Sequence, residues 1–418
     1  MPERVAIIGA GPAGLMAAER ITACRDSAQV TVYERMPRPA RKFLLAGRGG
    51  LNLTNTAEPV AFRSAFATGV GGDDAALAAA IAPLDDFDAG ALRAWCEGLG
   101  VETFVGSSGR VFPVHMKASP LLRAWLQRLD ERGVTFKFRN HWRGFTGTNG
   151  LSFDTDAGPN IETADVTILA LGGASWPRLG ADGQWRAALT SADVETTEFM
   201  PSNVGVTVNW SPHFAAEAAG LPLKRVTATL GGRTVSGELI VSRAGLEGGP
   251  IYALSPELRT ALLAVPPDDL TTAPVLLLDL RPDLTIEHLA DKLARAKKGR
   301  SLATRLKSQA GLDRAAALLV REPFGDGLPI DTKGLAARIK AMPVPILGLQ
   351  SLERAISSVG GIATTALTAD LMLKPRAGVF VAGEMIDWDA PTGGYLLHAC
   401  FAQGRRAAEG AAAWLSRR

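Results

Sequence analysis

Cysteine is scarce in this 418-residue sequence, with only Cys24, Cys96 and Cys400, far apart and without a CxxC pair. This scarcity argues against a disulfide framework and a dithiol redox centre, and favours a reducing, cytoplasmic location. Apolar runs are also short, and none reaches the roughly 18 residues of a membrane-spanning helix. The uncharged run 5–18 after Arg4 has the look of a signal peptide, but its glycine spacing favours a different role.

An excess of one charge is missing as well. Lys and Arg number 45, Asp and Glu 42, and the formal net charge is +3. Such a balance by itself indicates neither a nucleic-acid nor a membrane partner. Hydrophobic residues make up 47% and charged residues 21%, which is typical of a soluble globular protein and not of a disordered one. The length allows two or three domains of about 150 residues each.

The first thirty-odd residues carry the most information. Within residues 5–34, an apolar run leads into Gly9, Gly11 and Gly14, then into an Ala-rich helical pattern, then into a second apolar run that ends at Glu34. This order and spacing predict a βαβ unit with a dinucleotide-binding fingerprint. Gly9 makes the tight turn, Gly11 lets the backbone approach a pyrophosphate, and Gly14 lets the helix pack on the strand.

The start of this helix and Glu34 supply the binding chemistry. Unpaired N–H groups and a partial positive charge at a helix N-terminus attract phosphates, and a carboxylate at the position of Glu34 accepts hydrogen bonds from ribose hydroxyls. A plain glycine-rich turn between buried elements would leave Glu34 unexplained. The expected cofactor-binding residues here are Gly9, Gly11, Pro12, Ala13, Gly14, Glu34 and Arg35.

A second glycine-rich stretch, residues 41–55, reads RKFLLAGRGGLNLTN. Its composition alone leaves a ligand loop and an ordinary surface loop equally open. Together with the opening unit, it resembles the GRKLLxTGxGRCNLTN-like stretch of the HI0933-like family of bacterial NAD(P)/FAD-dependent oxidoreductases, which is related to bile-acid reductases. The resemblance implies that this segment wraps the flavin end of FAD, with candidate contacts Lys42, Gly47, Asn52 and Thr54. Leu51 stands where the family often has Cys, so no thiol serves the flavin there.

Two more stretches in the first half match the family. Residues 164–185 contain an apolar strand that runs into Gly172 and Gly173, a corner that brings backbone near the dinucleotide, with Leu171 in place of the usual Thr. Residues 109–113 read GRVFP, and the resemblance implies that Arg110 and His115 line the substrate side of the flavin, although a lone Arg or His near a helix start more often has a structural role. A helix is expected after this motif, with Ser119 as N-cap, Pro120 in its first turn and Gly133 at its end.

Residues 378–394 form the strongest motif after the opening one. An apolar strand ends at Gly383 and Glu384, and a loop through Asp387 reaches the pair Gly393 and Gly394 before a long Ala-rich segment. The resemblance implies that Glu384 binds the ribityl chain and that the final helix points its N-terminus at the flavin N1 and C2 carbonyl, where a positive dipole stabilises the anionic reduced flavin. The candidate contacts are Gly383, Glu384, Asp387, Gly393, Gly394 and Tyr395.

The last motif also departs from the family pattern. Leu396 and His398 replace the Asn and Gln that follow the tyrosine in the family, and His398 could face either the flavin or the core. With similar departures elsewhere, the chain resembles a divergent branch that matches the family over nearly its whole length.

The middle of the chain has a different texture. Alternating apolar patterns in residues 204–210, 225–230, 234–241 and 275–280 predict strands, and amphipathic patterns in residues 286–296, 302–310, 314–320 and 335–341 predict helices. We therefore expect an α/β fold of the two-dinucleotide-binding-domain flavoprotein type. Its Rossmann-like FAD-binding domain covers residues 1–195 and 346–418, a β-rich, barrel-like insert covers 196–282, and a helical insert covers 283–345.

The helical insert carries a basic cluster, which is either a solvated helix face or a phosphate-binding surface. Its members are Lys292, Arg295, Lys297, Lys298, Arg300, Arg305 and Lys307.

The sequence therefore predicts an FAD-dependent oxidoreductase. There is no second GxGxxG, so NAD(P)H would dock transiently over the flavin as the electron donor. One hypothesis is reduction of an activated carbon–carbon double bond in a small molecule. A second, motivated by the basic cluster, is an RNA-modifying, dihydrouridine-forming reductase, and a third is a flavin-binding redox sensor without turnover. No metal site and no membrane partner are expected, and no residue stands out as the catalytic acid.

Overall fold

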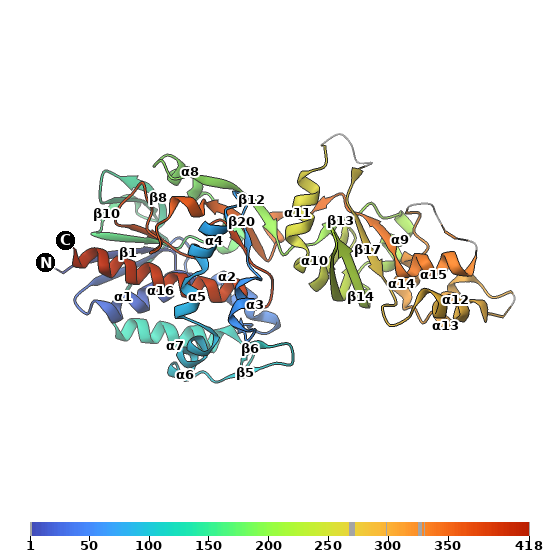
Figure 1. Ribbon diagram of the computed structural model, residues 1–418. Coiled ribbons are helices and arrows are strands. Elements are labelled where there is room, and N and C mark those ends of the chain that lie inside the picture. Colours follow the sequence, from blue (N-terminus) through green and yellow to red (C-terminus); the bar gives the residue numbers. More distant parts are fainter. Residues whose placement is uncertain (1, 267–271, 298, 325–327, 330, 418) are drawn as a thin grey trace. The chain divides into compact units, whose positions relative to one another are not determined.

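The computed structural model describes residues 2–266, 272–297, 299–324, 328–329 and 331–417 (Figure 1). The chain divides into two compact units. Unit 1 comprises Met1–Met200 and Ser357–Arg418, and unit 2 comprises Pro201–Ile356. The division into two units does not test the three domain boundaries that we expected near residues 195, 282 and 345, and these boundaries remain predictions.

Unit 1 is built on a five-stranded parallel sheet with the strand order β7-β2-β1-β11-β21. The chain starts in the middle, steps to one side and then crosses to the other, which is the order of a dinucleotide-binding fold. Parallel strands are covered on both faces, so β1 and β11 are nearly continuous buried apolar runs. The strands are β1 (Arg4–Ile8), β2 (Gln29–Glu34), β7 (Thr135–Phe138), β11 (Val166–Leu169) and β21 (Val379–Val381).

Two long helices cover one face of this sheet. Helix α1 (Pro12–Cys24) and helix α16 (Tyr395–Ser416) run side by side in Figure 1, and α16 also contacts β11 and β21. Their close approach depends on small residues, because a Cβ at Gly404 would collide with the Ala13 carbonyl. The other helices of unit 1 are α2 (Arg41–Ala46), α3 (Pro59–Arg63), α4 (Asp74–Ile81), α5 (Pro83–Asp86), α6 (Ala89–Gly98), α7 (Ala118–Glu131) and α8 (Trp185–Thr190).

A small antiparallel sheet that the sequence reasoning missed also packs on unit 1. It has the order β10-β9-β8, and the ring of Phe153 on β9 stacks on Tyr33 of β2 at 4.5 Å between centroids. Its strands are β8 (His141–Thr146), β9 (Gly150–Thr155) and β10 (Gly158–Thr163). The remaining strands of unit 1 are β3 (Thr54–Asn55), β4 (Ala67–Thr68), β5 (Thr103–Val105), β6 (Arg110–Pro113), β20 (Ser357–Ile362) and β22 (Trp388–Asp389).

Unit 2 contains a seven-stranded sheet with the order β18-β17-β14-β15-β16-β13-β19. The edge strands β18 and β19 are separated by only two residues along the chain. The two edges of the sheet therefore lie close together, and the sheet must curl as in a barrel. On β14, buried Val226 and Ala228 alternate with more exposed Arg225 and Thr227, as in a sheet with one face in the core. The strands are β13 (Val206–Thr207), β14 (Pro222–Leu230), β15 (Arg233–Val241), β16 (Gly245–Gly248), β17 (Val275–Asp279), β18 (Met342–Pro345) and β19 (Gly348–Leu349).

The helices of unit 2 share one hydrophobic core with this sheet. Leu289 and Leu293 on α12 are buried in the same cluster as Leu276 and Leu278 on β17. Side-chain N-caps start several of these helices, among them Thr285 for α12 (Ile286–Ala294), and each such cap contributes about 1 kcal/mol. The others are α9 (Pro212–Ala218), α10 (Gly249–Ala253), α11 (Ser255–Leu263), α13 (Leu302–Ser308), α14 (Arg314–Leu319) and α15 (Thr332–Lys340).

The structure corrects two local expectations from the sequence, the N-cap at Ser119 and the length of the strand at residues 204–210, and agrees with those for Pro120 and Gly133. Ser119 is not an N-cap: α7 begins one residue earlier, at Ala118, with Lys117 in the cap position and no side-chain cap. Pro120 still falls in the first turn, where its missing N–H has no intrahelical partner. Gly133, with φ +74°, follows the helix end as expected. The strand expected at residues 204–210 is shorter than predicted.

The chain leaves for unit 2 through β12 (Thr196–Ser202) and returns through β20, and these two strands pair. Cys24, Cys96 and Cys400 are free thiols, in agreement with the expected lack of a disulfide framework. Among the helices described, none is long and apolar enough to span a membrane.

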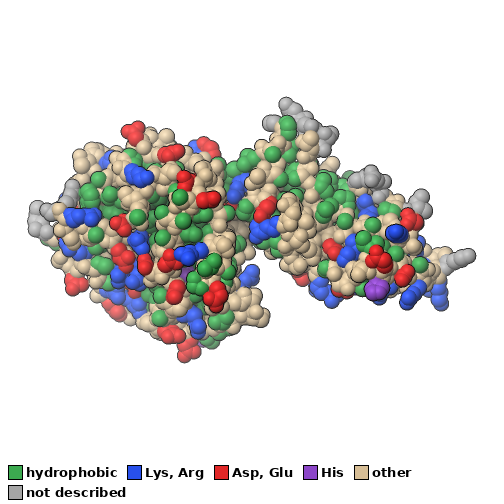
Figure 2. Space-filling view, in the orientation of Figure 1, with side chains coloured by type: hydrophobic (Ala, Val, Ile, Leu, Met, Phe, Trp, Pro, Cys, Tyr) green, Lys and Arg blue, Asp and Glu red, His purple; other side chains and the backbone are tan. Residues whose placement is uncertain are grey.

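The basic cluster lies on and between α12 and α13. Figure 2 shows Lys and Arg side chains along this edge of unit 2, with acidic side chains nearby. Lys292 is in the last turn of α12, and Arg305 and Lys307 are in the last turn of α13. Lys298 lies outside the described residues.

Candidate functional site

A pocket lies at the carboxyl ends of the parallel strands of unit 1. Strands β1 and β2 end in residues that line it, and the residues directly after β11 and β21 line it as well. This edge is where doubly wound sheets bind their ligands. Of the residues predicted to bind the cofactor, those that line it are Gly9, Gly11, Pro12, Ala13, Glu34, Arg35, Lys42, Gly172, Gly383 and Glu384. The pocket thus brings together residues from both ends of the chain.

The three glycines of the opening motif have three different surroundings. A Cβ at Gly9 would collide with the Ala170 carbonyl, and Gly9 has φ +107°, so this tight turn needs glycine. A Cβ at Gly14 would collide with the Gly9 carbonyl, so Gly14 allows α1 to pack against the turn. A Cβ at Gly11 would meet no protein atom within 4 Å, and Gly11 lines the pocket. Gly11 therefore leaves space for a ligand, whereas Gly9 and Gly14 leave space for the chain itself.

Glu34 ends β2 with its carboxylate at the pocket. Oε2 accepts from the backbone N–H of Ala10 at 3.0 Å, and Oε1 accepts from that of Met36 at 2.7 Å. These two bonds fix the carboxylate and leave further lone pairs for ligand hydroxyls. Burial raises the pKa of Glu34, although the two N–H groups and nearby Arg35 and Arg41 act in the opposite direction.

Lys42 and Glu384, 342 positions apart in sequence, form an ion pair in the pocket. Lys42 Nζ lies 2.6 Å and 2.9 Å from the two carboxylate oxygens of Glu384, and it also donates to Ser175 Oγ at 2.6 Å. Glu384 is 7% exposed and accepts from the backbone N–H of Ser358 at 2.9 Å. A Cβ at Gly173 would collide with Ser358 Oγ, so Gly173 gives this polar cluster its room. The two predicted contacts are therefore joined to each other.

One wall of the pocket was not foreseen. Asn140, His141 and Trp142 line it from the start of β8, and Asp182 and Trp185 line it from the segment before and at the start of α8. Asp182 pairs with the predicted residue Arg35. Burial lowers the pKa of His141, with Arg143 and Arg35 acting in the same direction, so the neutral ring is favoured. No sequence signal marked β8, although Asp182 belongs to one of the matched motifs.

The other predicted residues are not among the described residues that line this pocket. They are Gly14, Gly47, Asn52, Thr54, Gly173, Asp387, Gly393, Gly394 and Tyr395. Their roles as cofactor contacts stay predictions, and their surroundings differ from one residue to the next.

Thr54 and His398 are joined deep in unit 1. Thr54 Oγ1 lies 2.7 Å from His398 Nδ1, and His398 Nε2 lies 2.7 Å from the Phe87 carbonyl. A carbonyl only accepts, so Nε2 carries the proton and Nδ1 accepts from the threonine hydroxyl. His398 is 1% exposed, and burial lowers its pKa to about 4. His398 thus faces the core, which decides between the two orientations that the sequence left open.

Asp387 is a second buried carboxylate with a different environment. Oδ1 accepts from the backbone N–H groups of Val70 at 3.0 Å and Gly360 at 2.8 Å. Oδ2 accepts from the N–H of Gly71 and the hydroxyl of Thr197, both at 2.9 Å. Four protein donors therefore engage this side chain, which holds the loop after β4 against β20.

The start of α16 gathers the last predicted residues. Gly394, with φ +92°, precedes the helix, and a Cβ there would lie 2.6 Å from the backbone of Thr54. This close contact brings the segment after α2 against the helix N-terminus. Arg110 Nε and the Tyr395 ring both lie beside Gly393, 3.6 Å and 3.4 Å from the point where its Cβ would be. His115 is exposed.

The residues present fit FAD. The space above Gly11 and the uncapped N-terminus of α1 suit a pyrophosphate, and Glu34 suits ribose hydroxyls. Asn52 Oδ1 is buried and has no hydrogen-bond partner among the described residues, which is unusual for a buried polar atom. A ligand donor at this oxygen would complete its hydrogen bonding.

Fold and pocket together define unit 1 as a Rossmann-like FAD-binding domain, and the protein as a flavoprotein of the oxidoreductase class. The chain belongs to the HI0933-like family, whose Rossmann-domain model matches residues 3–410. The resemblance seen in the sequence motifs is thereby confirmed.

Individual relatives agree with this assignment. The chain is 25% identical over 434 residues to the 3-dehydro-bile acid delta(4,6)-reductase of Clostridium scindens, covering 98% of this chain and 99% of the relative. Among solved structures, it is similar to the open conformation of a flavocytochrome c3 fumarate reductase, with 15% identity over 99% of this chain and 78% of that chain, at a TM-score of 0.50. It is equally similar to the 3-ketosteroid delta1-dehydrogenase from Sterolibacterium denitrificans, with 13% identity over 98% and 99% of the two chains and a TM-score of 0.50. These two likenesses establish the fold alone.

Proposed function

We propose that this protein is an FAD-dependent reductase that takes hydride from NAD(P)H and saturates an activated carbon–carbon double bond in a small molecule. The observation that carries the proposal is the relative named as a 3-dehydro-bile acid delta(4,6)-reductase, which aligns with almost the whole of both chains. A match of this extent includes unit 2 as well as the FAD-binding domain. The substrate class would then be a conjugated, largely apolar ketone or a related alkene.

The residues of unit 1 would divide the work of holding FAD. When bound, the flavin supplies a hydride acceptor and donor. The N-terminus of α1 and Gly11 would take the pyrophosphate, and Glu34 would take ribose hydroxyls. Lys42 and Glu384 would lie along the ribityl chain that leads to the flavin ring.

The proposal that NAD(P)H is a transient electron donor follows from the number of dinucleotide-binding folds. The described residues contain one parallel sheet of the dinucleotide-binding type, and its pocket suits FAD. NAD(P)H would therefore bind transiently and leave before the alkene arrives, in a ping-pong sequence. This order separates the reaction into two halves that can be measured independently.

The test uses purified full-length protein. Heat denaturation should release FAD, and anaerobic mixing with NADH or NADPH should bleach the flavin spectrum. Adding a conjugated enone, from cyclohexenone to a 3-keto-4-ene steroid, should restore the oxidised spectrum and yield the saturated ketone. Protein that takes up no FAD would contradict the cofactor assignment, and reduced protein that no enone reoxidises would contradict the proposed reaction.

Two alternatives have weaker support. A dihydrouridine-forming reductase would need the basic cluster of α12 and α13 to bind RNA phosphates, and the cluster also contains acidic neighbours such as Asp291. Phosphate binding would fall steeply with salt, whereas reduction of an apolar enone would not. A redox sensor would show flavin reduction without multiple turnovers of any alkene.

A further inference from the structure

Saturating a double bond requires a proton as well as a hydride, and the proposed function leaves the proton donor unassigned. The acid must lie near the flavin end of the site, which the sequence motifs place at the segment after α2 and at the start of α16. The structure brings these two segments together, because Gly394 packs against the backbone of Thr54. The titratable side chains found there are His398, Arg110 and Tyr395.

His398 is unsuitable as the donor. Both ring nitrogens are already in hydrogen bonds, one with Thr54 and one with the Phe87 carbonyl, and the ring is 1% exposed. Arg110 is also a poor acid, because a guanidinium keeps its proton throughout the physiological range. Tyr395 remains, with an O–H group on a partly exposed side chain in the first turn of α16.

The ring of Tyr395 is held in place by aromatic neighbours from α3 and from the turn that follows it. It stacks on Phe62, with centroids 4.5 Å apart and planes inclined by 26°, and its edge approaches Phe66 at 6.0 Å. The Tyr395 ring and Arg110 Nε both lie beside Gly393. A positioned acid needs a fixed ring with an accessible hydroxyl, and the side chain of Tyr395 is partly exposed.

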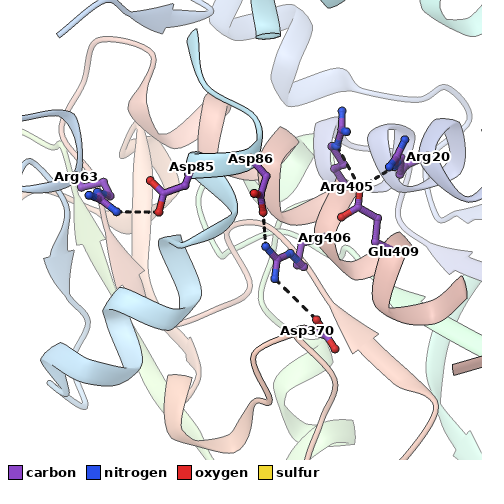
Figure 3. Close-up of polar contacts among 8 residues, drawn as sticks. All are labelled: Arg20, Arg63, Asp85, Asp86, Asp370, Arg405, Arg406 and Glu409. Atoms are coloured by element: carbon purple, nitrogen blue, oxygen red, sulfur yellow. Dashed lines mark hydrogen bonds and ion pairs between the residues drawn. The ribbon is translucent and has the colours of Figure 1, made fainter. Parts of the chain in front are cut away.

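Arg110 differs from the other arginines around α16 in its partners. Figure 3 shows Arg63 directed at Asp85, Arg406 between Asp86 and Asp370, and Arg20 and Arg405 both at Glu409. Among the described residues, Arg110 makes no ion pair. Its charge therefore acts on Tyr395 without a competing carboxylate, while Arg63 on the neighbouring α3 is neutralised by Asp85.

We propose that the Tyr395 hydroxyl donates the proton that completes alkene reduction, and that Arg110 stabilises the tyrosinate left behind. This inference rests on the proposed function. Burial raises the pKa of Tyr395 and Arg110 lowers it, so the phenol stays protonated at neutral pH while its anion gains a nearby cation. The Tyr395 phenol therefore stays protonated until it transfers its proton to the substrate.

The step balances in electrons and atoms. The hydride equivalent, derived from NAD(P)H, forms a C–H bond at the β-carbon of the enone and the π bond breaks. The O–H bond of Tyr395 then breaks, and its proton forms the second C–H bond at the α-carbon. The phenolate keeps the electron pair of the broken bond and regains a proton from water through the exposed side of the ring, while NAD(P)H ends as NAD(P)⁺.

A first test needs no bound cofactor or turnover. The chain has three tyrosines, Tyr33, Tyr252 and Tyr395, so ¹³Cζ-tyrosine labelling gives a readable titration, and Tyr395→Phe assigns the third signal. Burial raises the pKa of Tyr33 well above its ordinary value, which separates it from the signal of interest. Arg110→Met should raise the pKa of Tyr395 by about one unit, and Arg110→Lys should restore most of the difference. Identical titration in the wild type and Arg110→Met would refute the pairing.

The second test measures the two half-reactions. In Tyr395→Phe, oxidation of the reduced protein by an enone should slow at least about 100-fold. FAD content, reduction by NAD(P)H and oxidation by O₂ are measured on the same FAD-loaded variant, and the loss with the enone should exceed any change in them by at least about ten-fold, because none of them uses this proton. Tyr252→Phe, in unit 2, is the matched control and should leave all four quantities unchanged.

The possible outcomes distinguish a failure of the role of Tyr395 from a failure of the proposed function. A wild type that reduces no alkene would end both the proposed function and this inference. A wild type that turns over, with Tyr395→Phe oxidised by the enone at the same rate, would overturn the role of Tyr395 alone. If Tyr395→Phe binds no FAD, global replacement of tyrosine by 3-fluorotyrosine keeps the ring and makes the phenol more acidic. The alkaline limb of the enone reaction should then move to lower pH, and an unmoved limb would refute proton donation.

Discussion

Glu34 and Asp387 of unit 1 are two carboxylates that were both predicted to bind the cofactor, but their hydrogen-bond partners differ. Glu34 ends a parallel strand, uses two backbone N–H groups and presents the rest of its carboxylate to a pocket. Asp387 accepts four hydrogen bonds from the chain and is not among the described residues that line that pocket. Both residues are acids within motifs that match the family. What separates a binding carboxylate from one engaged by its own fold is the number of protein donors around it.

The largest effect should come from Asp387→Ala. Removing this carboxylate leaves buried donors from Val70, Gly71, Gly360 and Thr197 without an acceptor, so unit 1 should lose about 3 kcal/mol of unfolding free energy or more. Urea unfolding of the FAD-free protein measures the loss.

Asp154→Ala is the control, since its ion pair with Arg143 is half exposed and should contribute under about 1 kcal/mol. An Asp387→Ala variant that keeps its stability and loses FAD would reverse the contrast between the two carboxylates.

Gly11→Val should produce the next largest effect, and it should fall on the ligand alone. Its Cβ would meet no protein atom, so unfolding of the FAD-free protein should be unchanged, while FAD affinity falls by about 100-fold, or about 2.7 kcal/mol. Fluorescence titration with FAD measures the affinity.

Gly14→Ala provides the opposite case, because its Cβ collides with the Gly9 carbonyl and should destabilise the protein before any ligand is added. If Gly11→Val retains full FAD binding, the phosphate loop has been assigned wrongly.

Glu34→Gln should weaken FAD binding about ten-fold, or about 1.4 kcal/mol, because the amide keeps one acceptor oxygen and loses the charge. The variant also has a pH signature. Burial raises the pKa of Glu34 in the folded state, so the native protein binds this proton more tightly than the unfolded chain. Stability of the FAD-free wild type should therefore fall as pH rises through the folded pKa, which lies above the ordinary pKa of glutamate.

Chemical unfolding at a series of pH values, with Glu34→Gln as reference, isolates this contribution. The variant should lack the decline. A decline of equal size in both proteins would place its origin at another group.

The smallest effect is expected in unit 2, far in sequence from every flavin motif. Changing Lys297, Lys298 and Arg300 together to Glu should alter FAD content, NAD(P)H oxidation and stability by less than about 0.5 kcal/mol, as is usual for solvated charges. Protein that retains RNA at physiological salt, and a variant that releases it, would favour the RNA-modifying reading instead.

Local signals in the sequence were enough for part of the site. Gly9, Gly11, Gly14 and Glu34 lie within one βαβ unit, so their spacing along the chain fixes their spacing in space. Four strands of the insert and its helices α12 to α15 were also foreseen within a few residues, because their apolar periodicity is strong. Strands β16, β18 and β19 and helices α9, α10 and α11 were not foreseen.

Pairings between distant segments could not be foreseen. The bond between Thr54 and His398 joins residues 344 positions apart, and the pocket wall at β8 belongs to a sheet with weak alternation. Motif matching named Thr54 as a flavin contact but could not tell that its hydroxyl donates to a buried imidazole. Hydrogen-bond polarity and burial are properties of the folded chain, and a sequence pattern does not carry them.

The ends of unit 2 meet: the backbone N–H of Ile356 donates to the Asn203 carbonyl at 3.3 Å. Because the two ends of this insertion are in contact, a short linker could replace it without distorting the FAD-binding domain. Unit 2 also has a hydrophobic core of its own. The FAD-binding domain could therefore have exchanged one such module for another during evolution while keeping its cofactor site.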